Sequence, residues 1–157
     1  MKKSKEISDR FKEVFLDGTW IANTNYKQQL SDVNWQQATQ KINSLNTIAL
    51  LTFHVNYYLD GIINVFEGGD LDIRDMYSFN APEIKNEKEW IALKESLFSN
   101  ASIFSNHIEQ LTEENLNSNF VDKKYGSFYR NIEGMIEHAY YHLGQISLLK
   151  KLILNPV

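Results

Sequence analysis

Residues 86–111 read NEKEWIALKESLFSNASIFSNHIEQL and contain the clearest periodic pattern in the chain. Apolar residues recur there at successive intervals of 3, 4, 4, 3, 4 and 3, at Trp90, Leu93, Leu97, Ala101, Phe104, Ile108 and Leu111. This period is typical of an α-helix that buries one face. Asn86 followed three residues later by Glu89 resembles a capping box, so we predict that the helix begins after Asn86.

Three other segments show the same helical period. They are residues 3–16, which end before Gly18; a segment that begins after Asn46 and runs to Phe66 or Glu67 before Gly68 and Gly69; and a segment that begins after Ser127 and runs almost to the C-terminus. A shorter helix is expected over residues 35–42, capped by Ser31 or Asp32. Residues 70–85, which include Pro82, show no period and form a loop long enough to suspect that it covers something.

The composition supports one all-α domain. With 157 residues and 43% hydrophobic content, the chain can bury a single core, and neither a repeat nor a shift in composition divides it. Four long helices and one short extra helix predict an up-and-down four-helix bundle over residues 1–157.

The charge and cysteine counts exclude several classes of function. Sixteen Lys and Arg against twenty Asp and Glu leave a net charge of −4, which gives no basic surface for nucleic acid. The absence of cysteine excludes disulfides, Cys-ligated zinc and a cysteine nucleophile. Lys2 and Lys3 are not followed by the apolar stretch of a signal peptide, and no apolar run approaches the ~20 residues of a membrane span. We therefore expect a cytoplasmic protein with no membrane partner.

Three histidines fall where a bundle could bring them together. His138 and His142 are four residues apart, so their side chains stand on one helix face with Cβ atoms ~5–6 Å apart. On a helical wheel both border the apolar stripe of their segment, and His54 holds the same edge position in the segment after Asn46. Three imidazoles leave a coordination position open, as in catalytic zinc sites, and nickel, iron or manganese could also bind them. Helix-face histidines are also commonly hydrogen-bonded residues without a metal, and spacing alone does not choose between the two readings.

Other polar residues are weighed against this cluster. His107 has no histidine partner at helical spacing, and we predict that it is structural or solvent-facing. Four tyrosines could line a pocket or donate a proton, but helix packing explains them as well, and they are not assigned to the site: Tyr57, Tyr58, Tyr140 and Tyr141.

The segment IEHAYYHLGQI, residues 136–146, resembles the H-x-x-x-H-x-G-Q-I signature of the DinB-like superfamily. NTIALLTFH, residues 46–54, is similar to the segment that delivers the first histidine of that family, and the resemblance covers nearly the whole chain. It implies a four-helix bundle, commonly a homodimer, in which His54, His138 and His142 bind a divalent metal, often zinc or nickel. Relatives in that superfamily include transferases that use a low-molecular-weight thiol such as bacillithiol, mycothiol or glutathione.

Three functions follow as hypotheses. The first is a metal-dependent transferase that adds an external thiol to an electrophilic small molecule, because a metal-coordinated thiol is deprotonated at neutral pH. The second is hydrolysis, which lacks an evident base, since Glu133 and Glu137 point away from His138 on the wheel. Gln145 and Asn131 lie on the histidine stripe, and Gln145 is either a group that orients a ligand or an amide at the helix edge. The third is a non-catalytic metal-binding bundle that serves a protein partner.

Overall fold

The structure is a computed structural model that describes residues 2–155. It confirms the all-helical class. Within that range the only β-type pairing is a single bridge between Asn119 and Ser127. The predicted domain of residues 1–157 includes Met1, Pro156 and Val157, which lie outside the described residues.

The helices vary widely in length. In chain order they are α1 (Lys3–Lys12), the π-helical turn η1 (Glu13–Asp17), α2 (Tyr26–Leu30), α3 (Trp35–Thr39), α4 (Ile48–Phe66), the 3-10 turn η2 (Asp75–Tyr77), α5 (Glu87–Gln110), α6 (Glu113–Asn117), the 3-10 turn η3 (Lys123–Tyr125) and α7 (Phe128–Leu154). The four long predicted segments are present, the first of them as α1 continued by η1. The two helices α2 and α6 were not predicted, because five residues are too few to show a period.

Two of the predicted helix starts are confirmed. The side chains of Asn86 and Ser127 accept hydrogen bonds from backbone N–H groups in the first turns of α5 and α7. The capping box at α5 does not close, because the Glu89 carboxylate accepts from the N–H of Lys85 rather than from that of Asn86. Gly68, with a φ of 88°, ends α4 as predicted.

Two other predicted caps were wrong by one to three residues, although α3 begins at Trp35 as predicted and ends at Thr39 rather than at residue 42. Thr47, not Asn46, caps α4. Asn34, rather than Ser31 or Asp32, caps α3 and forms a complete capping box with its third residue. In both cases several neighbouring residues can accept the same backbone hydrogen bond, so the sequence alone did not single out the cap.

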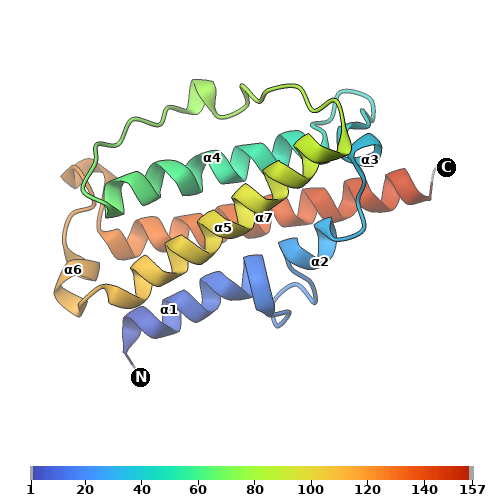
Figure 1. Cartoon of the computed structure of the whole chain (residues 1–157). Coiled ribbons are helices and arrows are strands. Elements are labelled where there is room, and N and C mark those ends of the chain that lie inside the picture. Colours follow the sequence, from blue (N-terminus) through green and yellow to red (C-terminus); the bar gives the residue numbers. More distant parts are fainter. Residues whose placement is uncertain (1, 156–157) are drawn as a thin grey trace.

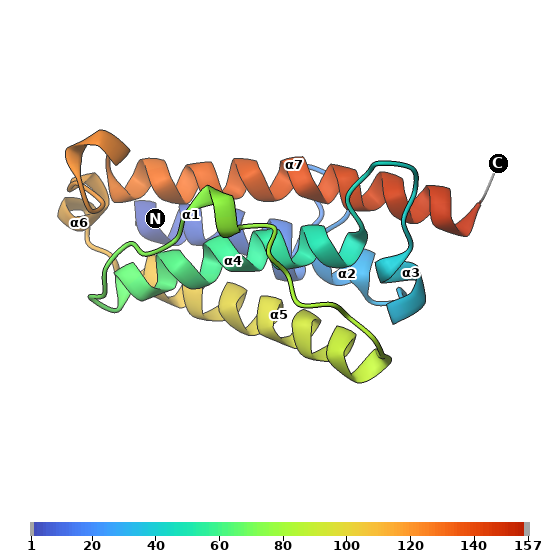
Figure 2. The same ribbon diagram turned by 90° about the horizontal axis from the view of Figure 1, so that it is seen from above.

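The long helices do not simply alternate in direction. Figures 1 and 2 show α4 and α5 running the same way, while α1 and α7 run the opposite way. Residues 70–85, here called the strap, make this possible because they return along the length of α4 before α5 begins. Contacts link α4 to α5 and α7, and α1 to α5 and α7.

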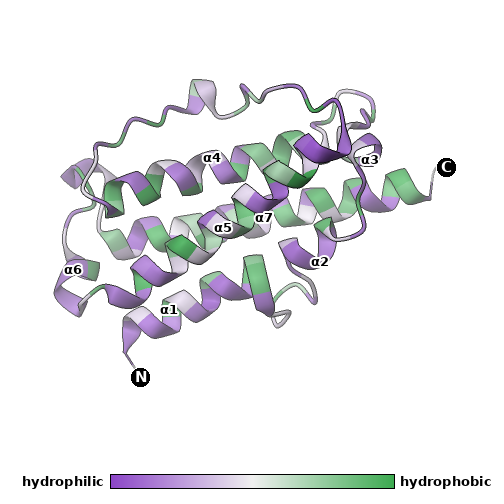
Figure 3. Ribbon diagram, viewed as in Figure 1, coloured by the Kyte–Doolittle hydropathy of each residue, from purple (hydrophilic) through white to green (hydrophobic). Residues whose placement is uncertain are grey.

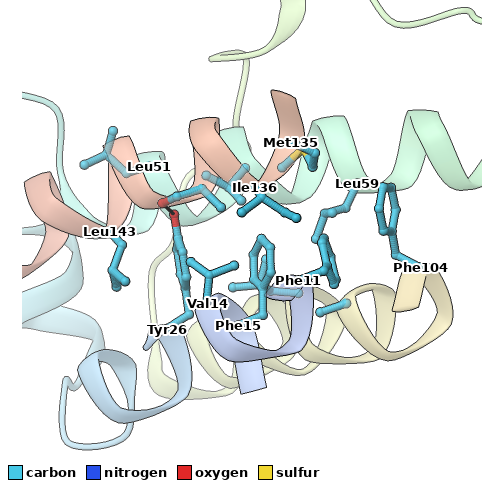
Figure 4. Close-up of a cluster of buried hydrophobic side chains, with 14 of the residues drawn as sticks. Phe11, Val14, Phe15, Tyr26, Leu51, Leu59, Phe104, Met135, Ile136 and Leu143 are labelled. Carbon is cyan, nitrogen blue, oxygen red and sulfur yellow. Dashed lines mark hydrogen bonds between the residues drawn. The ribbon is translucent and has the colours of Figure 1, made fainter. Parts of the chain in front are cut away.

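The core lies between these helices and is strongly aromatic. Phe11 is fully buried and packs against Phe15 and Phe104, with ring centroids 4.7 and 4.6 Å apart (Figure 4). Tyr26, which α2 brings into this cluster, stacks on Phe15 and donates a hydrogen bond of 2.8 Å to the carbonyl of Ala139 on α7. The short helix α2 is therefore tied directly to α7.

Hydrophobic and hydrophilic residues alternate along the long helices, as expected of helices that bury one face (Figure 3). Among residues 2–155, none of the helices combines the length and apolarity needed to cross a membrane.

Candidate metal centre

The structure brings the three predicted histidines together. His54 comes from α4, and His138 and His142 come from adjacent turns of α7. The Nε2 atom of His138 lies 3.1 Å from Nε2 of His54 and 2.9 Å from Nε2 of His142. The ring planes are inclined at 63° to 89° to one another, so the imidazoles meet by their edges, where the nitrogen lone pairs lie.

The outer nitrogens of two of these rings are held by acceptors. Nδ1 of His54 lies 3.2 Å from the carbonyl oxygen of Ser78, and Nδ1 of His142 lies 2.7 Å from Oε1 of Gln145. A carbonyl oxygen only accepts, so each Nδ1 carries the proton. The neutral ring then has a free lone pair on Nε2, directed at the common centre.

This donor set fits one divalent cation. Two nitrogens that share an ion at ~2.1 Å cannot be more than about 4.2 Å apart, and the two separations from His138 satisfy that limit, while all three ligand atoms lie within 4.8 Å of one another. Without a cation, a single proton on Nε2 of His138 could serve only one of its two neighbours. The three Nε2 atoms have too few protons between them to form a complete hydrogen-bond network. A shared metal ion satisfies all three lone pairs.

Electrostatics keep the three imidazoles neutral. Burial lowers the pKa of all three. Burial, together with repulsion from protonated His142 and His54, brings the pKa of His138 to about 4, and repulsion from protonated His142 also lowers the pKa of His54. The Asp75 carboxylate acts in the opposite sense on those two rings. At neutral pH the ligand atoms are therefore unprotonated, as metal binding requires.

The site is covered on its outer side. His54 and His142 are 5% and 6% exposed, and His138 is half-buried. The ring of Phe79, from the strap, lies parallel to the His54 ring at a centroid distance of 4.0 Å and an angle of 9°. The ring of Tyr58 meets His54 and His138 edge-on at 5.1 Å. The predicted loop over residues 70–85 thus covers His54.

Gln145 takes the first of the two roles left open by the sequence, because it hydrogen-bonds a candidate ligand. Asn131, on the same stripe, instead donates to the carbonyls of Tyr125 and Ser127 at the start of α7. An amide at the Gln145 position can orient a ring but cannot take up a proton.

The two glutamates of α7 point away from the site, as predicted. Glu137 pairs with Arg130 at 3.1 Å, and Glu133 pairs with Arg10 at 3.4 Å. His107 is likewise separate from the cluster, since it stacks on Phe66 and lies 3.6 Å from a Glu67 carboxylate oxygen.

Two of the four tyrosines border the histidines. The ring of Tyr141, which is 65% exposed, lies edge-on to His142, and Tyr58 lies edge-on to His54 and His138. The other two do not: the hydroxyl of Tyr57 bonds Arg74 of the strap, and that of Tyr140 donates to Glu13. Helix packing alone therefore does not account for Tyr58 and Tyr141.

Three further residues around the histidines that the sequence did not indicate lie in the strap. Ser78 orients His54, Phe79 covers it, and Asp75 supplies the nearby negative charge. The one available signal was the length of the aperiodic loop, which indicated a cover but not which residues make contact.

A separate cavity lies elsewhere in the structure. It measures about 900 Å³ and lies between α3, α4, α5 and the end of the strap, with Trp35, Phe53 and Leu93 among its walls and none of the histidines. Phe53 precedes His54 but points to another side of α4. The cavity is therefore separate from the histidine cluster.

Comparison of the chain with models of protein families, with curated proteins and with solved structures finds no significant match.

Proposed function

We propose that this chain is a divalent-metal-dependent enzyme that transfers an external low-molecular-weight thiol to an electrophilic small molecule. The observation that carries the proposal is the convergence of the three Nε2 atoms of His54, His138 and His142 from α4 and α7. His54, His138 and His142 would hold the ion, with zinc or nickel as the first candidates and iron or manganese as further ones. A divalent ion bound there would lower the pKa of a coordinating thiol from ~8.5, so that the sulfur is a nucleophile at neutral pH.

The protein's own residues prepare this site. Ser78 and Gln145 fix the ring orientation of two ligands, and burial keeps all three imidazoles neutral. The thiol has to come from a cosubstrate, because the chain contains no cysteine. We attribute the arrangement to the DinB-like superfamily and describe it as a four-helix bundle with a crossover strap between α4 and α5. A homodimer belongs to the same proposal, and Tyr141 and Leu148, exposed seven residues apart on α7, supply apolar surface for it.

The first experiment is elemental analysis of protein purified without a nickel column. We expect close to one divalent ion per chain, lost in His138→Ala and retained in the matched control His107→Ala. The metal-loaded protein should then consume a thiol and a generic electrophile, again with loss of activity in His138→Ala only. A wild-type chain that takes up no zinc, nickel, iron or manganese would exclude the site.

Hydrolysis is the second candidate, because the structure places the Asp75 carboxylate within electrostatic range of His54 and His138. A carboxylate there could act as the base that the helices do not provide. Turnover of an ester or amide without thiol, reduced in Asp75→Asn, would favour hydrolysis over transfer. A filled metal site with neither activity would favour the non-catalytic reading.

A further inference from the structure

The strap supplies no candidate ligand, yet two of its consecutive residues hold a ligand ring in place. Ser78 is 2% exposed and accepts the Nδ1 proton of His54 through its backbone carbonyl. Phe79 lies flat against the same ring. One short segment therefore contacts His54 twice, by a hydrogen bond to Nδ1 and by stacking on the ring face. His142, in contrast, is oriented by Gln145 of its own helix.

Tyrosine hydroxyl groups on α4 anchor the strap just before that segment. Tyr57 donates to the carbonyl of Arg74 at 3.1 Å and accepts from the N–H of Arg74 at 2.8 Å. The hydroxyl of Tyr58 donates to Oδ1 of Asp75 at 2.7 Å. The strap is therefore fixed to α4 three to four residues before the carbonyl that binds His54.

A glycine on α4 provides the space for this docking. Gly61 is buried in the middle of the helix, and a Cβ atom added there would collide with the side chain of Ile73. Glycine is disfavoured in a helix interior relative to alanine. Its place here is explained by the close approach of the strap.

We infer that the strap is the positioning element of the metal site, so that docking of the strap onto α4 and binding of a divalent cation by the three histidines strengthen each other. The inference rests on the proposed function, because it concerns the same site. Docking selects the His54 tautomer with a free Nε2 and fixes its ring. It also holds the Asp75 carboxylate on the hydroxyl group of Tyr58, whose ring meets His54 and His138 edge-on at 5.1 Å. Coupling of this kind is reciprocal: the factor by which docking raises metal affinity equals the factor by which metal stabilises docking.

The decisive variant is Gly61→Ala, which displaces the strap and leaves every ligand unchanged. We expect the zinc affinity, measured by competition with a chromophoric chelator, to fall about 10-fold or more, the range typical of groups that orient a ligand. The matched control is Gly134→Ala, because an added Cβ at that helical glycine meets nothing within 4 Å. The double variant Gly61→Ala/Ile73→Ala removes the colliding side chain and should recover part of the affinity.

A second measurement, amide hydrogen exchange, monitors the docking of the strap directly. Zinc should slow hydrogen exchange of strap amides that are hydrogen-bonded when the strap is docked, such as those of Arg74, Tyr77 and Ser78. The slowing should be absent in Gly61→Ala and unchanged in Gly134→Ala. Phe79→Ala covers the case in which Gly61→Ala fails to fold, because Phe79 is 41% exposed and its truncation spares the core.

The outcomes separate the two proposals. Absence of zinc binding by the wild type would overturn the proposed function. Zinc binding by the wild type with equal affinity in folded Gly61→Ala and Phe79→Ala, and with no change in strap exchange, would overturn the role of the strap and leave the metal site standing.

Discussion

The aromatic core lies among α1, η1, α2 and α5, whereas the histidine cluster lies between α4 and α7, and the two regions are held in different ways. In the core, Phe11, Phe15 and Phe104 from three elements bury one another completely. In the cluster, two imidazoles keep their orientation through single hydrogen bonds, one of them from the strap. Burial of apolar surface is spread over many contacts, whereas a few polar contacts can be lost one at a time. Substitutions in the core should therefore lower the free energy of unfolding, whereas substitutions around the cluster should lower the metal affinity.

The largest effect is expected from Phe11→Ala. Removal of a fully buried phenylalanine side chain leaves a cavity between Phe15 and Phe104 and should lower the free energy of unfolding by about 3–5 kcal/mol. Urea denaturation measures the loss. Trp20→Ala is the matched control, because Trp20 is 87% exposed and its truncation should change stability by less than about 0.5 kcal/mol. If the folded fraction of Phe11→Ala also binds zinc more weakly than the wild type, the core and the histidine cluster are not independent of each other.

The core could be predicted from the sequence because helical geometry has a fixed period. Residues three and four apart share a face, so the stripe that contains Trp90, Leu97 and Phe104 identifies both a helix and its buried side. The same geometry placed His138 and His142 one turn apart and put His54 on a comparable edge.

The strap could not be predicted in this way. Residues 70–85 have no period, so nothing in the order of their side chains indicates that Ser78 and Phe79 meet His54. Those contacts are set by where α4 ends and by the space beside Gly61, which exist only in the folded chain. The parallel course of α4 and α5 was missed for the same reason, because it depends on the path of the loop.

A smaller effect, confined to binding, is expected from Gln145→Leu. The variant removes the acceptor for the Nδ1 proton of His142 and should weaken zinc binding about 10–100-fold while the fold is retained. Gln145→Glu keeps an acceptor and should bind zinc at least as tightly as the wild type. Asn131→Ala is the control on the same stripe, since Asn131 bonds only backbone carbonyls at the start of α7. Titration calorimetry that gives equal affinities for Gln145→Leu and the wild type would show that His142 is oriented by packing alone.

The pH dependence of stability should also distinguish the two regions. Burial holds the pKa of the three histidines below the unfolded value of about 6.5, and that of His138 at about 4. The unfolded chain therefore binds more protons between these values, so metal-free protein should lose stability as the pH falls from about 6.5 toward 4. We expect the melting temperature to drop by a few degrees between pH 7 and pH 5. The drop should be shallower in His138→Gln, and an equal slope in both proteins would indicate that His138 is accessible to protons in the folded state.

The smallest effect is expected from Glu137→Gln, directly before His138 in the sequence. Glu137 is exposed on the outer side of α7, and its pairing with Arg130 is exposed as well. Exposed pairs contribute about 0–1 kcal/mol, so the unfolding free energy and the zinc affinity should remain close to those of the wild type. Asp75→Asn makes the same carboxylate-to-amide change on the strap and should weaken zinc binding more, because the Asp75 charge acts on His54 and His138. If Glu137→Gln proves the more damaging of the two to zinc binding or turnover, proximity along the helix governs the site rather than docking of the strap.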